Sequence, residues 1–109
     1  MSEIIVGIDL GTTNSEIALY RDGRPAVLAD DAARLILPSV VGLADDGSLL
    51  VGEEARNQYL LHPERTVRSI KRRMGRDEKV RLGERDYAPQ EISAMILRRL
   101  KEIAEARLG

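Results

Sequence analysis

Residues 4–20 read IIVGIDLGTTNSEIALY, and this stretch decides how the chain begins to fold. A short β-branched run over residues 3–9 is typical of a buried strand, and the alternating residues 15–21 predict a second strand. Between the two runs stand a carboxylate, a glycine, two threonines and an asparagine. The sequence therefore predicts two strands joined by a turn that carries polar side chains.

The residues of this turn suit a phosphate group and a hydrated magnesium ion. Gly11 allows a close approach of the backbone or a positive φ, and turn N–H groups with the hydroxyls of Thr12 and Thr13 form a concavity that favours an anion. Asp9 would repel a phosphate unless a cation or its waters lay between them. Mg²⁺ keeps several waters and binds through few carboxylates plus phosphates. An ordinary hairpin turn, in which these residue types are common, explains the same stretch.

Two better-known phosphate motifs are excluded here. The Walker A loop needs G-x-x-x-x-G-K-[ST] leading into a helix, whereas this turn leads into a predicted strand. The turn does not contain G-x-G-x-x-G either. The local pattern alone therefore leaves a phosphate turn and a plain hairpin as alternatives.

The chain continues as a meander of strands. Asp22-Gly23 is a hairpin-turn signal, so residues 3–30 predict three antiparallel strands. Pro25 belongs at the start or the edge of the third strand because it has no N–H to donate. A further strand with Pro38 near its start follows, and the turn at Asp46-Gly47 leads into a short strand.

The pattern changes to a helical one from Glu53. One helix is predicted to stop at Pro63, and a second is predicted to run from there to Gly75. The segment 77–88 is polar and predicts a short strand or a loop. Pro89 then opens a last helix, whose apolar stripe comprises Ile92, Ile96, Leu100 and Ile103.

Composition narrows the class of protein. The 109 residues are 43% hydrophobic, which permits a core and argues against disorder throughout. Cysteine is absent and the N-terminus lacks the pattern of a signal peptide, so we expect a cytoplasmic protein without a membrane span. The net charge is −1, and the basic run from Arg56 to Arg76 has few interleaved aromatic residues, so nucleic acid is not an expected partner.

Three strings resemble one family in the right order. GIDLGTTNSEIAL is similar, nearly residue for residue, to the first phosphate-binding motif of the 70-kDa heat-shock chaperones (DnaK type), which are actin-like ATPases. LPSVVGLADDGSLLVGEEARNQYLLHPERTVRSIKRRMGR and YAPQEISAMILRRLKEIAEARLG resemble the segments that follow in the same family. The resemblance covers essentially the whole chain.

The resemblance implies roles for particular positions. Gly11, Thr12, Thr13 and Asn14 would bind the β- and γ-phosphates of ATP or ADP, and Asp9 would hold Mg²⁺ through water and act in catalysis. Lys71 would reach the γ-phosphate and the attacking water, so it is expected both to bind the nucleotide and to act in catalysis. Arg72 and Arg76 would face the cleft, the opposite lobe or solvent.

The resemblance also implies a fold and a function. We expect a mixed α/β fold that forms the N-terminal part of an actin-like, ribonuclease H-like ATPase domain. Residues 1–37 and 89–109 would belong to its base lobe, and 38–88 to a smaller α/β lobe. The longer parent protein would be a stress-response chaperone that binds and releases unfolded polypeptides, assisted by a J-domain co-chaperone and a nucleotide-exchange factor. The 109 residues alone are expected to be inactive and to self-associate.

Other interpretations stay open at this point. A sugar kinase or a filament protein shares the D-x-G-T core with this family, and a non-catalytic interaction module would need no nucleotide. His62 precedes Pro63 at a predicted helix end, where a capping or surface role is expected. The acidic pairs Asp30-Asp31 and Asp45-Asp46 are expected to be turn residues rather than metal ligands.

Overall fold

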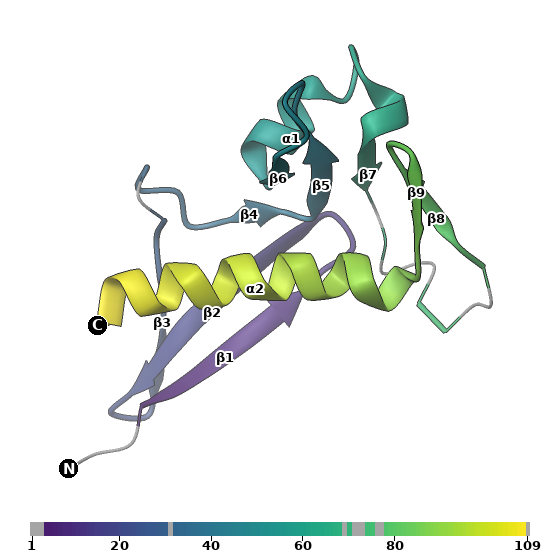
Figure 1. Ribbon diagram of the computed structural model, residues 1–109. Coiled ribbons are helices and arrows are strands. Elements are labelled where there is room, and N and C mark those ends of the chain that lie inside the picture. Colours follow the sequence, from purple (N-terminus) through teal and green to yellow (C-terminus); the bar gives the residue numbers. More distant parts are fainter. Residues whose placement is uncertain (1–3, 31, 69, 71–73, 76–77, 109) are drawn as a thin grey trace.

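A computed structural model describes residues 4–30, 32–68, 70, 74–75 and 78–108. In these residues, three small antiparallel sheets pack with two α-helices, and the long helix α2 crosses in front of the first sheet (Figure 1). The mixed α/β class predicted from the sequence is therefore confirmed.

The first sheet is the predicted meander. Its strands β1 (Ile5–Leu10), β2 (Asn14–Arg21) and β3 (Arg24–Val27) pair antiparallel in that order. Asp22 and Gly23 join the last two with φ of 53° and 76°, as a two-residue hairpin turn requires. The short strand β4 (Leu37–Pro38) pairs with the start of β2.

The second sheet has β5 (Val40–Leu43) at its centre. Strand β6 (Leu49–Val51) pairs with one side of β5, and β7 (Thr66–Arg68) pairs with the other. Helix α1 (Glu53–Gln58) packs against this sheet. The helix is shorter than predicted, because the chain turns at residues 59–61, before Pro63.

The helix predicted over 63–75 is wrong at its start. A single 3-10 turn η1 (Pro63–Arg65) is followed by strand β7, in which Thr66 lies opposite Gly42. The side-chain amide of Gln58 donates to the Leu43 carbonyl (3.0 Å) and to Thr66 Oγ1 (3.1 Å). Tertiary pairing with β5 and the β-branched residues at this position outweigh the helical pattern.

The segment 77–88, for which the sequence allowed a strand or a loop, contains a hairpin. Strands β8 (Val80–Leu82) and β9 (Arg85–Tyr87) pair antiparallel. Helix α2 (Pro89–Leu108) follows directly. Proline occupies its first position, and the Glu91 carboxylate accepts the Ala88 N–H at 2.9 Å, so the predicted start of this helix is confirmed.

The core is one buried cluster that reaches all three sheets. Helix α2 contributes the predicted stripe, whose four residues are at most 5% exposed, and it contacts β2, β5 and β6. The other buried members include Ile17 from β2, Val41 from β5 and Leu82 from β8. The division into a base lobe (1–37 and 89–109) and a smaller lobe (38–88) stays a prediction.

Strand β1 was predicted to be buried, which is wrong: its residues from Ile5 to Asp9 are exposed. It is hydrogen-bonded to β2, with no second strand partner among the described residues, and Ile4, Ile5, Val6 and Ile8 are 39–62% exposed. An uncovered apolar strand edge favours pairing with another chain. Self-association of the 109 residues stays a prediction, which sedimentation velocity would test.

The stripe of α2 generates the first prediction. Ile96→Ala should lower the free energy of unfolding by roughly 2–5 kcal/mol, since Ile96 is fully buried and its loss leaves a cavity. The neighbouring Leu97 is 37% exposed, so Leu97→Ala should cost at most about 1 kcal/mol. Urea unfolding of the 109-residue chain measures both values. Equal losses for the two variants would show that α2 packs through another face.

Candidate phosphate-binding turn

The turn between β1 and β2 is formed by residues 11–13. Gly11 is required there for space, because a Cβ atom at this position would collide with the carbonyl oxygen of Asn14. Glycine thus lets the two strands close on a very short loop. The position of the turn agrees with the sequence prediction.

The polar side chains of the turn are accessible. Thr12 is half-buried, and Thr13 and Asn14 are exposed. Among the described residues, none forms a side-chain hydrogen bond with these three side chains. Their hydroxyl and amide groups are therefore available to a ligand.

Asp9 lies on the sheet face opposite to α2. It is exposed and stands directly across from Glu16, so the two carboxylates share one face beside the turn. Like charges in directly opposed positions destabilise a strand pair, and a divalent cation beside them would offset the repulsion. Oxygen donors of this kind fit Mg²⁺. Glu16 was not singled out from the sequence, although the alternation of residues 15–21 does place it on the sheet face opposite to Ser15 and Ile17.

The floor of the turn is a pair of buried serines. Ser39, between β4 and β5, donates its hydroxyl to the Gly11 carbonyl at 2.8 Å, and its N–H donates to the Thr13 carbonyl at 2.8 Å. Ser15 Oγ lies 2.8 Å from Ser39 Oγ. Both serines are at most 2% exposed. The sequence motifs gave no reason to single out either residue.

The expected catalytic lysine cannot be placed relative to this turn. Lys71, Arg72 and Arg76 lie outside the described residues. Their expected roles in binding and catalysis therefore stay predictions.

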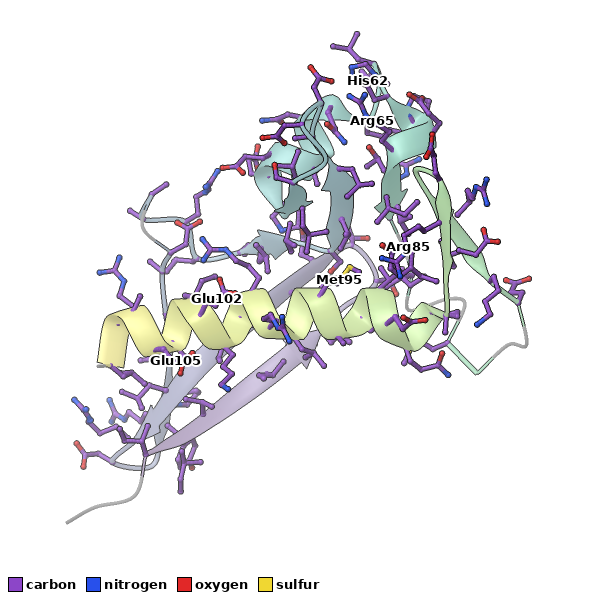
Figure 2. All side chains as sticks on the ribbon, in the orientation of Figure 1. His62, Arg65, Arg85, Met95, Glu102 and Glu105 are labelled. Atoms are coloured by element: carbon purple, nitrogen blue, oxygen red, sulfur yellow. The ribbon has the colours of Figure 1, made fainter. Side chains whose placement is uncertain are left out.

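The other candidates lie elsewhere and act structurally. His62 stands at the tip of the segment after α1, away from β1, with its Nδ1 3.6 Å from a Glu64 carboxylate oxygen (Figure 2). Asp45 pairs with Arg65 at 2.7 Å. Hydrogen bonding from the Ser48 side chain, and then from its N–H at 2.9 Å, holds the pKa of Asp46 below its usual value. No group of three or more acidic or histidine side chains suited to a metal occurs in the described part of the chain.

Comparison with known proteins identifies the family. Residues 5–109 match the family described as "Hsp70 protein". The chain belongs to the Hsp70 family. It is 55% identical over 108 residues to the chaperone protein DnaK of Thermotoga neapolitana, and 54% identical over the same length to those of Thermotoga petrophila and Thermotoga maritima. Each alignment covers 98% of this chain and 18% of the relative.

This Hsp70-family chain therefore spans less than a fifth of the length of these relatives. Family membership confirms the resemblance of the three strings, and it decides against the sugar-kinase and filament-type alternatives. In the described residues, no helix is long and apolar enough to cross a membrane.

A second polar cluster, missed from the sequence, lies around Asp30. This residue was expected to be a turn residue, which is confirmed: its Oδ1 accepts the N–H groups of Ala32 and Arg34, both at 2.9 Å. It is also only 6% exposed and pairs with the Arg34 guanidinium at 3.0 Å. Burial raises the pKa of Asp30, but the hydrogen bonds from Arg34 and Ala32 outweigh it and hold the pKa below its usual value.

The C-terminal end of helix α2 holds the same loop through Arg107. The Arg107 guanidinium donates to the Ala29 carbonyl at 2.8 Å and to the Asp30 carbonyl at 2.9 Å. The sequence could not reveal this contact, because the partners stand 77 and 78 positions apart. The end of α2 is thus tied to the loop after β3.

The lowered pKa of Asp30 predicts a pH dependence in this Hsp70-family chain. The stabilisation is complete above the unfolded pKa of about 3.9 and is lost as the pH falls through the lower folded value. Asp30→Asn keeps the acceptor oxygen for both N–H groups but does not titrate. Its free energy of unfolding should therefore fall less steeply below pH 5 than that of the wild type.

Urea unfolding across pH 2–6 measures these slopes. Arg34→Met removes the guanidinium and keeps the N–H bond to the carboxylate, so its slope should be intermediate. Identical slopes for all three proteins would mean that Asp30 is not stabilised as a carboxylate.

Proposed function

We propose that this chain forms the N-terminal part of the ATPase domain of an Hsp70-type chaperone. In that protein, Mg·ATP binding and hydrolysis would drive the binding and release of unfolded polypeptide. The observation that carries the proposal is the β1–β2 turn, where available hydroxyls of Thr12 and Thr13 lie beside the exposed carboxylate of Asp9. Family membership supports the same assignment.

The turn would bind the phosphates of the nucleotide. Thr12, Thr13 and Asn14 offer hydroxyl, amide and backbone N–H donors, and Gly11 keeps the loop short. Such donors stabilise charge on phosphate oxygens in a fixed orientation. Asp9 would hold the hydration shell of Mg²⁺, which when bound supplies positive charge to the β- and γ-phosphates.

Lys71 would provide a positive charge that stabilises the transition state more than it stabilises the bound nucleotide. Phosphoryl transfer depends on positioning and on stabilising charge at the transferred oxygens. We assign the ammonium group of Lys71 to the γ-phosphate and the attacking water. This role, like that of Asp9, comes from the family motif and awaits a direct test.

The partners of the complete protein follow from the same proposal. Unfolded polypeptides, a J-domain co-chaperone and a nucleotide-exchange factor would bind mainly through segments that this chain does not include. We propose a cytoplasmic location, with no role for nucleic acid or membranes. Residues 1–37 and 89–109 would form the base lobe, and 38–88 the smaller lobe.

The proposed roles of Asp9 and Lys71 predict loss of turnover on substitution. The test protein is a chimera in which this chain replaces the matching 108 residues of the Thermotoga neapolitana DnaK. Lys71→Ala should lower the rate of ATP hydrolysis by on the order of a hundredfold with nucleotide binding largely retained, since transition-state stabilisation is lost. Asp9→Asn should also lower the rate.

A matched control completes this test. Lys101→Ala removes an exposed lysine of α2 and should leave the rate unchanged. An unaltered rate in the Lys71→Ala chimera would refute the catalytic role. A chimera that folds but never hydrolyses ATP would favour the alternative of a non-catalytic interaction module.

The isolated 109-residue chain should neither hydrolyse ATP nor bind it tightly. Small-molecule sites bury most of the ligand surface, whereas one turn contacts only the phosphates and leaves adenine and ribose in water. Isothermal titration calorimetry with Mg·ATP measures this. A dissociation constant in the low micromolar range or tighter would show that these residues form a more complete site than proposed.

A further inference from the structure

Ser39 contacts the phosphate-binding turn twice although it stands 28 positions after Gly11. Its backbone N–H donates to the Thr13 carbonyl and its hydroxyl donates to the Gly11 carbonyl, each at 2.8 Å. One buried residue therefore fixes a carbonyl at each end of the three-residue turn. Ser39 makes this contact from the junction of β4 and β5.

The hydroxyl bonds have a defined direction. A serine hydroxyl has a single proton, and that of Ser39 is used in the bond to the Gly11 carbonyl. In the contact between the two hydroxyls, Ser15 is therefore the donor and Ser39 Oγ the acceptor. Ser15, Ser39 and Gly11 form a short chain of buried hydrogen bonds, in which each bond polarises the next.

Pro38 explains why the next residue supplies the N–H. Asn14 and Pro38 are directly opposed in the β2–β4 pair. Proline has no N–H, so this can only be a non-hydrogen-bonded pair. The adjacent N–H of Ser39 then reaches the Thr13 carbonyl. Strand β4 thus sets the distance between Ser39 and the turn.

The orientation of the turn peptides follows from these bonds. All peptide bonds in the described residues are trans, so the C=O and the N–H of one peptide point in opposite directions. Because the Gly11 carbonyl points to Ser39, the Thr12 N–H points away from it. The Thr13 carbonyl also points to Ser39, so the Asn14 N–H points away from Ser39 as well.

We propose that Ser39 is a positioning residue of the phosphate-binding turn. By holding the carbonyls of Gly11 and Thr13 inward, it keeps the N–H of Thr12 directed toward the ligand side. The identity of the ligand rests on the proposed function. The hydrogen bonds from Ser39 to the turn do not depend on that function. Preorganised donors stabilise transition-state charge without reorganisation during the reaction.

Loss of the hydroxyl should free the turn locally. In Ser39→Ala the Gly11 carbonyl and the Ser15 hydroxyl lose their partner in a buried site, which favours rotation of the Gly11–Thr12 peptide so that the carbonyl reaches another donor or water. Glycine at position 11 opposes such a rotation least. The effect should therefore concentrate in residues 11–14 rather than spread through the core.

Nuclear magnetic relaxation of the 109-residue chain tests the tether without nucleotide. Backbone order parameters near 0.85 are typical of rigid segments and values below 0.6 of flexible ones. In Ser39→Ala the values for residues 11–14 should fall toward the flexible range, with α2 unchanged. Ser93→Ala removes another buried serine, whose hydroxyl contacts Met74, and should leave the turn rigid.

Two further variants test the role of the hydroxyl. Ser39→Thr keeps it and should restore the order parameters. Ser15→Ala removes only the donor to Ser39 and should loosen the same residues less. If Ser39→Ala fails to fold, the Ser15→Ala result decides, since an unaltered turn in that variant would remove the support for a hydroxyl tether.

The chimera described above tests whether the tether serves turnover. Ser39→Ala should lower kcat for ATP at least tenfold with a smaller change in KM, Ser39→Thr should recover most of it, and Ser93→Ala should match the parent chimera. A loosened turn with unchanged kcat, in a chimera that Lys71→Ala inactivates, would overturn the positioning role and leave the proposed function intact. An inactive parent chimera would overturn the proposed function. It would also overturn the role of Ser39 in positioning a phosphate-binding turn.

Discussion

The buried stripe of α2 is the contact on which the other features depend. Its four residues pack against the first sheet, while the same helix contacts β5 and β6 of the second. Without that shared core, β5 would be joined to the first sheet mainly through the short β2–β4 pair, and Ser39 at the junction of β4 and β5 would be held less firmly against the turn. An apolar helix face, which has no chemistry of its own, therefore determines where the polar groups of the candidate site lie.

The site itself consists mainly of backbone. The Gly11 and Thr13 carbonyls are bonded to Ser39, and this orientation leaves N–H groups on the other side of the turn. A phosphate site built in this way needs few side chains, but every peptide must keep its direction. Buried hydrogen bonds meet this need better than exposed ones, because water cannot replace them without cost.

The sequence predicted those features whose cause is local. The hairpin at Asp22-Gly23, the polar turn and the start of α2 each depend on residues a few positions apart, and all were predicted correctly. Strand β7 was not, because Thr66 is extended only through its partner Gly42 in β5. The Arg107 contact to the loop after β3 and the Ser39 contact to the turn join residues far apart in the chain, so no periodicity or motif could reveal them.

The pairing of Asp9 with Glu16 adds a constraint to this arrangement. The register of β1 and β2 places two carboxylates in opposed positions on the face beside the turn. Their mutual repulsion weakens the strand pair next to the turn that it must hold. A hydrated cation beside Asp9 would relieve that repulsion, while a bound phosphate alone would increase it. In the proposed site, anion and cation therefore stabilise the turn only together, which is the physical reason for a nucleotide that arrives as its magnesium complex.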